Sequence, residues 1–167
     1  MSYQIRPFNR SDYEGLFKLL SHPSSYQYQS WKITTFEEAE KFLDTMDQMR
    51  EGLKYLVLEI NNEIIGACLL QLNLKHHEGE IGYIVSHEHC GKGLATYMAN
   101  YLLDLGFNTY QLNRIFASTD VENIASYKVM EKIGMTREGL LRQNKRINDS
   151  YRDSYIYSIL RSEYQNG

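Results

Sequence analysis

The sequence has few of the residues that would place it outside the ordinary globular proteins. It contains two prolines and no stretch rich in proline, glycine or serine, so we expect neither a linker nor a disordered tail. Its two cysteines, Cys68 and Cys90, are too few for a disulfide framework. No apolar run approaches the ~18–20 residues that span a bilayer, and the first residues lack the apolar core of a signal peptide. We therefore expect a cytoplasmic protein that does not associate with a membrane.

The length and charge of the chain narrow the class further. Its 167 residues fit one domain, predicted to cover residues 1–167, and can bury a core without disulfide or metal staples. The formal net charge is −3, whereas proteins that follow a nucleic-acid backbone are usually basic, so no direct nucleic-acid partner is expected. A mildly acidic surface is compatible with cationic partners such as amines. Both a monomer and a homodimer remain open.

Hydrophobic periodicity divides the chain into alternating helices and strands. Apolar residues recur every three to four positions at about 11–20, 35–50, 94–105 and 123–133, which predicts four helices. The first two begin with capping-box patterns at Ser11 and Thr35, each followed by glutamate three residues later. Strands are predicted at 3–6, 55–60, 64–74, 78–85, 114–119, 135–147 and 151–160. Residues 23–34 are expected to be irregular.

The resulting order, β-α-α-β-β-β-α-β-α-β-β, predicts an α/β protein with a mixed (α+β) sheet. Residues 78–119 form a strand, a helix and a strand in this scheme, so we expect one βαβ crossover at the centre. Asn61-Asn62 and Asn148-Asp149 are predicted to be tight turns, because asparagine and aspartate tolerate positive φ. Gly134 is predicted to end the fourth helix.

Gly91 and Gly93 lie between a predicted strand and a predicted helix. Glycines there permit a tight turn and leave backbone N–H groups unobstructed, and the first N–H groups of a helix attract anions. The pattern is not a Walker loop, which needs serine or threonine directly after Gly-Lys. It is also not a dinucleotide fingerprint, because Thr96 occupies the third glycine position. Taken alone, the two glycines indicate either a phosphate site or a structural turn.

The segment GKGLA at residues 91–95, placed after a predicted strand, resembles the coenzyme A loop of the GNAT N-acetyltransferase superfamily. Residues 80–83 (EIGY) before it, and 123–126 (NIAS) and 131–135 (EKIGM) after it, match the same family in order and spacing. Further resemblance to the branch of bacterial ribosomal-protein N-terminal acetyltransferases is carried by Trp31 and by segments 137–142, 147–148 and 151–153. The resemblance implies a GNAT-like acyl-CoA N-acyltransferase fold and an acetyl-CoA-dependent N-acetyltransferase.

The resemblance also implies the cofactor, acetyl-coenzyme A. Ile84 and Val85 are expected to act through main-chain groups that pair with the pantetheine amides like an added strand. Cys90 stands where the family usually has glutamine or arginine, and Lys92 either adds charge near the phosphates or points into water. The residues expected to bind the cofactor are Ile84, Val85, Cys90, Gly91, Lys92, Gly93, Leu94, Ala95, Thr96, Asn123 and Ser126.

The chemistry calls for a base, because only a neutral amine attacks a thioester. Glu80, on a predicted strand between Gly79 and Ile81, is the candidate catalytic base, since burial there would raise its pKa. The alternative is a solvated strand glutamate or the partner of a basic side chain. Many family members carry a tyrosine near the departing sulfur that acts as the general acid. In this sequence that position is Met130, which cannot donate a proton. The branch resemblance instead implies a catalytic role near the thiol for Ser126. The alternative roles of Ser126 are a hydrogen bond to the cofactor and a cap at the start of a helix.

The acceptor is the least defined part of the prediction. Trp31, Tyr83 and Tyr151 are the residues expected to bind it, although segment 151–153 equally fits a strand ion pair. The expected acceptor is a primary amine, first of all the N-terminal α-amine of a ribosomal or other protein. The alternative acceptor is a small amine such as a polyamine or an aminoglycoside-like molecule. Two further alternatives concern the reaction itself: transfer of an acyl group other than acetyl, and a non-catalytic sensor that only binds acyl-CoA. No metal is expected, because the histidines of the sequence lack a third ligand at suitable spacing.

Overall fold

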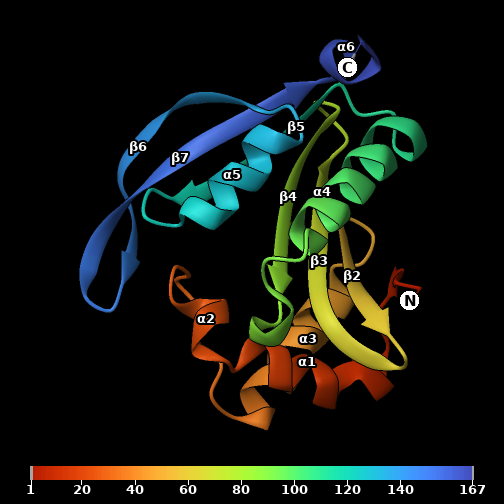
Figure 1. Cartoon of the computed structure of the whole chain (residues 1–167), viewed down its shortest axis with the longest axis vertical. Coiled ribbons are helices and arrows are strands. Elements are labelled where there is room, and N and C mark those ends of the chain that lie inside the picture. The colour runs from red at the N-terminus through yellow and green to blue at the C-terminus, as the bar shows by residue number, and fades with distance from the viewer. Residues whose placement is uncertain (1, 167) are drawn as a thin grey trace.

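A seven-stranded mixed sheet organises the chain, with strands in the order β1-β2-β3-β4-β5-β7-β6 (Figure 1). The computed structural model describes residues 2–166. The strands are β1 (Gln4–Pro7), β2 (Leu53–Ile60), β3 (Glu63–Asn73), β4 (Glu78–Val85), β5 (Arg114–Asp120), β6 (Thr136–Ile147) and β7 (Ser150–Leu160). Strands β4 and β5 are parallel and the other pairings are antiparallel. The predicted mixed sheet and its central crossover are therefore confirmed.

Helices cover both faces of this sheet (Figure 1). Helices α4 (Leu94–Asp104) and α5 (Ile124–Lys132) pack on one face and bury the larger core, while α1 (Tyr13–Leu20) and α3 (Phe36–Gln48) cover the other face. Successive residues of a strand point to opposite faces. Accordingly Ile81 of β4 belongs to the core under α4, and Ile84 packs with the α1 and α3 side.

Local sequence signals explain where the helices on this face begin. Thr35 and Glu38 form the predicted capping box of α3, with the Thr35 hydroxyl accepting from the Glu38 N–H at 3.2 Å. The predicted capping box at Ser11 is wrong. Asn9 and Asp12 form one instead, around a short 3₁₀ turn, and α1 begins at Tyr13. The extended backbone of Asn9 allows its side chain to bond the Ser11 N–H, so the chain is already capped two residues before Ser11.

The predicted turns are confirmed by their backbone angles. Asn61 and Asn62 have φ of +49° and +65°, Asn148 and Asp149 have +48° and +63°, and Gly134 has +92°. Two α-helices within the described residues were not predicted. Helix α2 (Pro23–Tyr26) interrupts the segment expected to be irregular, and α6 (Arg161–Asn166) follows β7. Both have six residues or fewer, which is too short for hydrophobic periodicity to give a signal.

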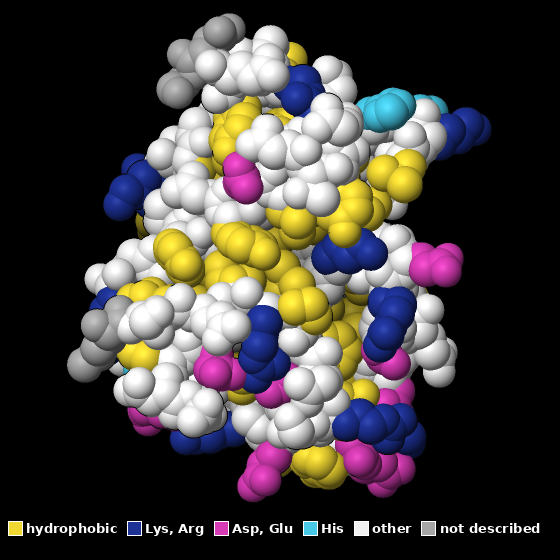
Figure 2. All heavy atoms as spheres, turned by 90° about the vertical axis from the view of Figure 1, so that its right-hand side faces the viewer, with side chains coloured by type: hydrophobic (Ala, Val, Ile, Leu, Met, Phe, Trp, Pro, Cys, Tyr) yellow, Lys and Arg dark blue, Asp and Glu magenta, His cyan; other side chains and the backbone are white. Residues whose placement is uncertain are grey.

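A band of hydrophobic side chains crosses the face of the molecule that is turned to the viewer in Figure 2. Large apolar side chains that stay exposed include Tyr97 and Tyr101 of α4, at 45% and 38% exposure. Tyr3 packs beside Tyr97, with ring centroids 6.3 Å apart, so the beginning of the chain covers part of α4. Neither Tyr97 nor Tyr101 lines the groove described next.

Candidate active site

Strands β4 and β5 separate from one another part of the way along their length. They pair at Glu78↔Arg114, Gly79↔Ile115 and Glu80↔Phe116, yet β4 continues to Val85 and β5 to Asp120. Beyond Glu80 the facing edges of the two strands therefore have no ladder between them, and backbone groups there are available to another molecule. A groove of about 550 Å³ occupies this opening.

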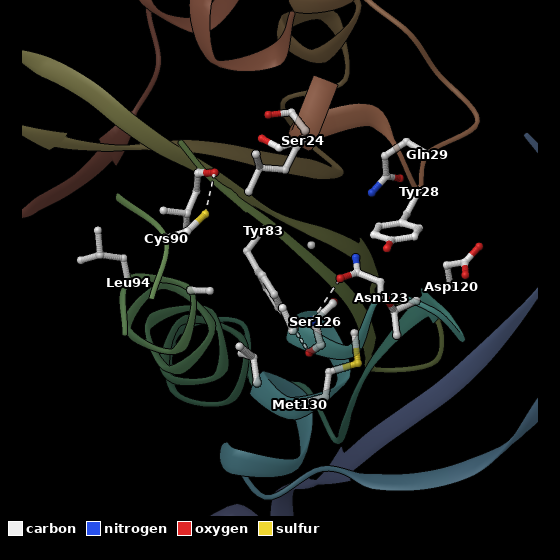
Figure 3. A pocket seen from close by; sticks show the side chains of 18 of the residues that line it. Ser24, Tyr28, Gln29, Tyr83, Cys90, Leu94, Asp120, Asn123, Ser126 and Met130 are labelled. Atoms are coloured by element: carbon white, nitrogen blue, oxygen red, sulfur yellow. Dashed lines mark hydrogen bonds between the residues drawn. The ribbon is translucent and has the colours of Figure 1, made fainter. Parts of the chain in front are cut away.

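Four parts of the fold surround this groove, which we call the central groove. They are β4, the loop from His87 to Gly93 with the start of α4, the end of β5 with the first turns of α5, and the segment around α2, and Lys145 of β6 adds one further side chain. Figure 3 shows Tyr83 extending from β4 towards Ser126, with Tyr28 and Gln29 on the same side of the groove as Asp120. The predicted cofactor residues that line it are Ile84, Val85, Cys90, Gly91, Gly93, Leu94, Ala95, Thr96, Asn123 and Ser126. Lys92 is exposed and does not line it.

The glycine loop has the conformation of an anion site. Gly91 and Gly93 both have φ of +78°, and a Cβ at either position would meet nothing within 4 Å. Backbone conformation, rather than crowding, therefore requires glycine at both positions. Gly93 caps α4, and the first helical bond runs from the Tyr97 N–H to the Gly93 carbonyl at 3.0 Å. The N–H groups of Leu94 to Thr96 precede that bond and lie at the positive end of the helix dipole, so this loop fits the phosphates of coenzyme A.

Cys90 stabilises the loop from within. Its thiol donates to the Ser86 carbonyl at 3.4 Å, and the Ser86 hydroxyl lies 2.8 Å from Nδ1 of His89. The side chain at this position therefore bonds the loop itself. A long glutamine or arginine is not needed to hold the loop's shape, which explains how cysteine is accommodated there.

Three side chains meet where α5 begins beside β4. The Asn123 side chain caps the helix by accepting from the Ser126 N–H at 3.3 Å. The Tyr83 hydroxyl donates to the Ser126 carbonyl at 3.0 Å, and burial raises the pKa of Tyr83 to about 12. Met130 lines the groove one helical turn further on and is 2% exposed. Ser126 and Tyr83 thus both bring a hydroxyl group to this wall of the central groove.

Glu80 stands at the last paired position before β4 and β5 separate. Strand alternation puts it on the opposite face of β4 from Tyr83, with Gly82 and Ile84. Burial raises the pKa of Glu80, a nearby Lys145 opposes that rise, and Glu78 adds to it. Lys145 itself lines the central groove from β6. The carboxyl group predicted as a base therefore lies where the two strands separate, but Glu80 itself is not among the residues that line the central groove.

Asp120 contributes a carboxylate to the central groove, but that carboxylate is already bonded. Arg152 of β7 donates to it from Nε at 2.9 Å and from Nη2 at 2.7 Å, and the Glu122 N–H adds a bond of 2.9 Å. Burial acts to raise the pKa of Asp120, but the bonds from Arg152 outweigh it and hold the pKa below its usual value. Of the two predicted roles for residues 151–153, the structure shows the ion pair through Arg152, and Tyr151 is 66% exposed and lines no described groove.

Several further residues of the central groove were not predicted individually from the sequence. Ser24, Gln27, Tyr28 and Gln29, from α2 and the segment after it, line the central groove, as does Lys145. They are ordinary polar residues without a motif, and only the fold brings them to β4. Trp31 packs on Phe42, with ring centroids 5.9 Å apart, and lines a neighbouring groove instead.

Comparison with known proteins agrees with this geometry. Residues 3–136 match a family model described as "Acetyltransferase (GNAT) domain". The uncharacterized N-acetyltransferase YnaD of Bacillus subtilis is 30% identical, over 96% of this chain and 94% of its own. The structure of spermidine N-acetyltransferase from Vibrio cholerae in complex with CoA and spermine superposes with a TM-score of 0.87 at 28% identity, covering 98% of both chains. The ribosomal L7/L12 α-N-protein acetyltransferase RimL, in complex with coenzyme A, shares the fold at 21% identity and a TM-score of 0.89, over 96% of this chain and 94% of its own.

Proposed function

The chain belongs to the GNAT acetyltransferase family and is an acetyl-coenzyme A-dependent N-acetyltransferase, and from this premise we propose that its acceptor is the N-terminal α-amine of a protein. Within the described residues 2–166, no helix is both long enough and apolar enough to cross a membrane. Both cysteines are free. We extend the proposal to a cytoplasmic enzyme, because free thiols persist in a reducing compartment.

The observation that carries the choice of acceptor is the charge of the acceptor wall. On that side the central groove is lined by Ser24, Gln27, Tyr28 and Gln29, which are uncharged, and by Lys145, which is cationic. The carboxylate that reaches this wall, Asp120, is neutralised by Arg152. A polyamine, with several ammonium groups, would need carboxylates here. A peptide offers one amine followed by amide groups, which hydroxyl and carboxamide side chains bond well.

The proposed chemistry assigns one task to each side of the central groove. The loop at Gly91 to Thr96 binds phosphates, and backbone groups of β4 beyond Glu80 pair with the pantetheine amides. Glu80 takes one proton from the acceptor ammonium through water, so that the neutral nitrogen attacks the thioester carbonyl carbon. The new N–C bond forms as the C–S bond breaks, and the attacking nitrogen loses its second proton as it becomes an amide. The thiolate that leaves takes a proton from Ser126, which recovers one from the nitrogen through water, or takes that proton directly from solvent.

A second candidate acceptor is a polyamine. It is favoured by one specific observation, the similarity of almost the whole chain to spermidine N-acetyltransferases of Vibrio cholerae and Escherichia coli. The acidic side chains that polyamine recognition would require are absent from residues 21–35, the segment that contributes the acceptor wall.

The deciding experiment follows thiol release from acetyl-coenzyme A with three sets of acceptors: N-terminal peptides, the same peptides with a blocked α-amine, and spermidine or spermine. We expect release with free peptides alone, and mass spectrometry should place the acetyl group on the α-nitrogen. Turnover of spermidine without turnover of peptides would overturn the proposal in favour of the polyamine. Turnover of blocked peptides that contain lysine would indicate a side-chain amine instead.

A further inference from the structure

A second groove, which we call the side groove, opens next to the central groove. It has a volume of about 470 Å³ and lies between the α2 segment, the loop after β4 and the tip of the β6–β7 hairpin. Ser24, Gln27, Gln29 and His87 line both grooves, so the two are continuous along one wall. An acceptor whose amine lies in the central groove can therefore extend along these shared residues into the side groove.

The charged residues that line the side groove are all basic. Lys32 approaches from the segment after α2, and Arg146 approaches from the hairpin on the other side. No aspartate or glutamate among the described residues 2–166 lines it. Lys32 lies over the Tyr26 ring, 5.5 Å from its centroid, and Arg146 bonds Asp149 at 2.8 Å on an exposed turn. Asp149 lies outside the groove and is 90% exposed, so solvent screens much of its effect on Arg146.

Two histidines that line the side groove are held in place by their contacts. His22 and His87 stack with ring centroids 5.0 Å apart and planes inclined by 16°, which joins the start of α2 to the loop after β4. Nδ1 of His22 also lies 2.8 Å from the Ser24 hydroxyl. An extended peptide in this groove would lie among the side chains of Lys32 and Arg146, which line it as well.

Resting on the proposed function, we infer that the side groove receives the residues directly after the acceptor's N-terminal residue and selects N-termini that carry aspartate or glutamate there. Cations on both walls attract carboxylates and repel lysine or arginine, which gives specificity as well as faster association. The same charges disfavour a polyamine that extends out of the central groove. The formal net charge of −3 describes the whole chain, whereas the two cations act locally at the side groove.

The test compares three peptides that share the first residue and differ at positions two to four, which are acidic, neutral or basic. We expect kcat/KM to be roughly fivefold higher for the acidic than for the neutral peptide at low salt, and lowest for the basic one, as two solvent-exposed ion pairs would produce. The preference for the acidic peptide should decline as salt is added, because salt screens solvent-exposed charges such as those of Lys32 and Arg146.

Variants assign the preference to this groove. Lys32→Gln together with Arg146→Gln should bring the ratio of acidic to neutral kcat/KM close to one, and Lys32→Glu should move the preference towards the basic peptide. Lys41→Gln and Arg50→Gln, matched substitutions at exposed positions outside both grooves, should retain the wild-type ratio. All four positions are exposed, so folding is expected to survive.

Each outcome has a distinct meaning. Peptide turnover that is independent of charge overturns the inference and leaves the proposed function standing. Acidic preference that persists in the double variant overturns the assignment to the side groove. Turnover of small amines without any peptide turnover overturns both.

Discussion

Arg152 of β7 bonds the carboxylate of Asp120 of β5 twice, although the two residues are 32 positions apart. The carboxylate is 1% exposed, whereas the guanidinium is 26% exposed and also bonds Glu122 at 2.6 Å. The pair joins two strands at the mouth of the central groove and removes the free negative charge from its acceptor wall. It therefore matters for stability and for the choice of acceptor.

The first prediction concerns this pair. Asp120→Asn should lower the free energy of unfolding by about 2–3 kcal/mol at pH 7, because it leaves a cation without its buried partner. The pKa of Asp120 is held below its usual value, so its contribution is complete above the unfolded pKa and is lost as pH falls below it. Urea denaturation from pH 7 to pH 3 should show the two proteins converging in acid. Asp149→Asn, at an exposed ion pair, is the control and should cost less than about 0.5 kcal/mol.

The second prediction tests the base. Glu80→Gln should lower kcat by about a hundredfold or more, while the affinity for coenzyme A is retained. Because burial raises the pKa of Glu80, the wild-type rate should rise with pH through that pKa, and the variant should lose this limb. A raised carboxyl pKa means that the folded state loses stability as pH rises above the unfolded pKa.

The variant should consequently be as stable as the wild type at pH 7, or more stable. A loss of stability with unchanged kcat would show that Glu80 serves only as a partner of Lys145. Thermal unfolding measured beside the pH–rate profile distinguishes the two roles.

The third prediction concerns the loop. Gly93→Ala should weaken coenzyme A binding and lower the free energy of unfolding by about 1 kcal/mol, because φ is +78° there. Calorimetry of coenzyme A binding and urea denaturation measure the two effects. Gly52→Ala is the matched control: nothing lies within 4 Å of its Cβ position and its φ is not in the positive range, so it should leave both quantities unchanged. Equal effects at the two positions would contradict the role given to the backbone of Gly93.

The fourth prediction concerns the proton that the thiolate receives. Ser126→Ala removes one hydroxyl but leaves the Ser126 carbonyl, so the bond from Tyr83 survives. We expect kcat to fall roughly tenfold, a small effect for an acid because a thiolate leaves readily. Single-turnover kinetics would isolate the chemical step. Tyr83→Phe, the comparison variant, should cost about 1 kcal/mol of stability for the lost bond. A larger loss of kcat in Tyr83→Phe than in Ser126→Ala would make Tyr83 the donor.

Sequence by itself determined the parts of this protein that depend on neighbouring residues. The capping box at Thr35, the turn at Asn61-Asn62 and the left-handed Gly93 follow from the conformations that a few adjacent residues prefer. The order of long helices and strands follows from hydrophobic period, which failed for the single turn of α2 because so short a helix has none.

Tertiary structure alone decided which distant groups meet. The last pairing of β4 with β5 at Glu80, the bond from Tyr83 to residue 126 and the neutralisation of Asp120 by Arg152 join positions that are 32 to 43 residues apart. Such contacts depend on the order of strands in the sheet and on where pairing stops, and local preferences encode neither. The sequence therefore proposes which residues bear the chemistry, while the charge of the acceptor wall was set by partners that only the fold brings together.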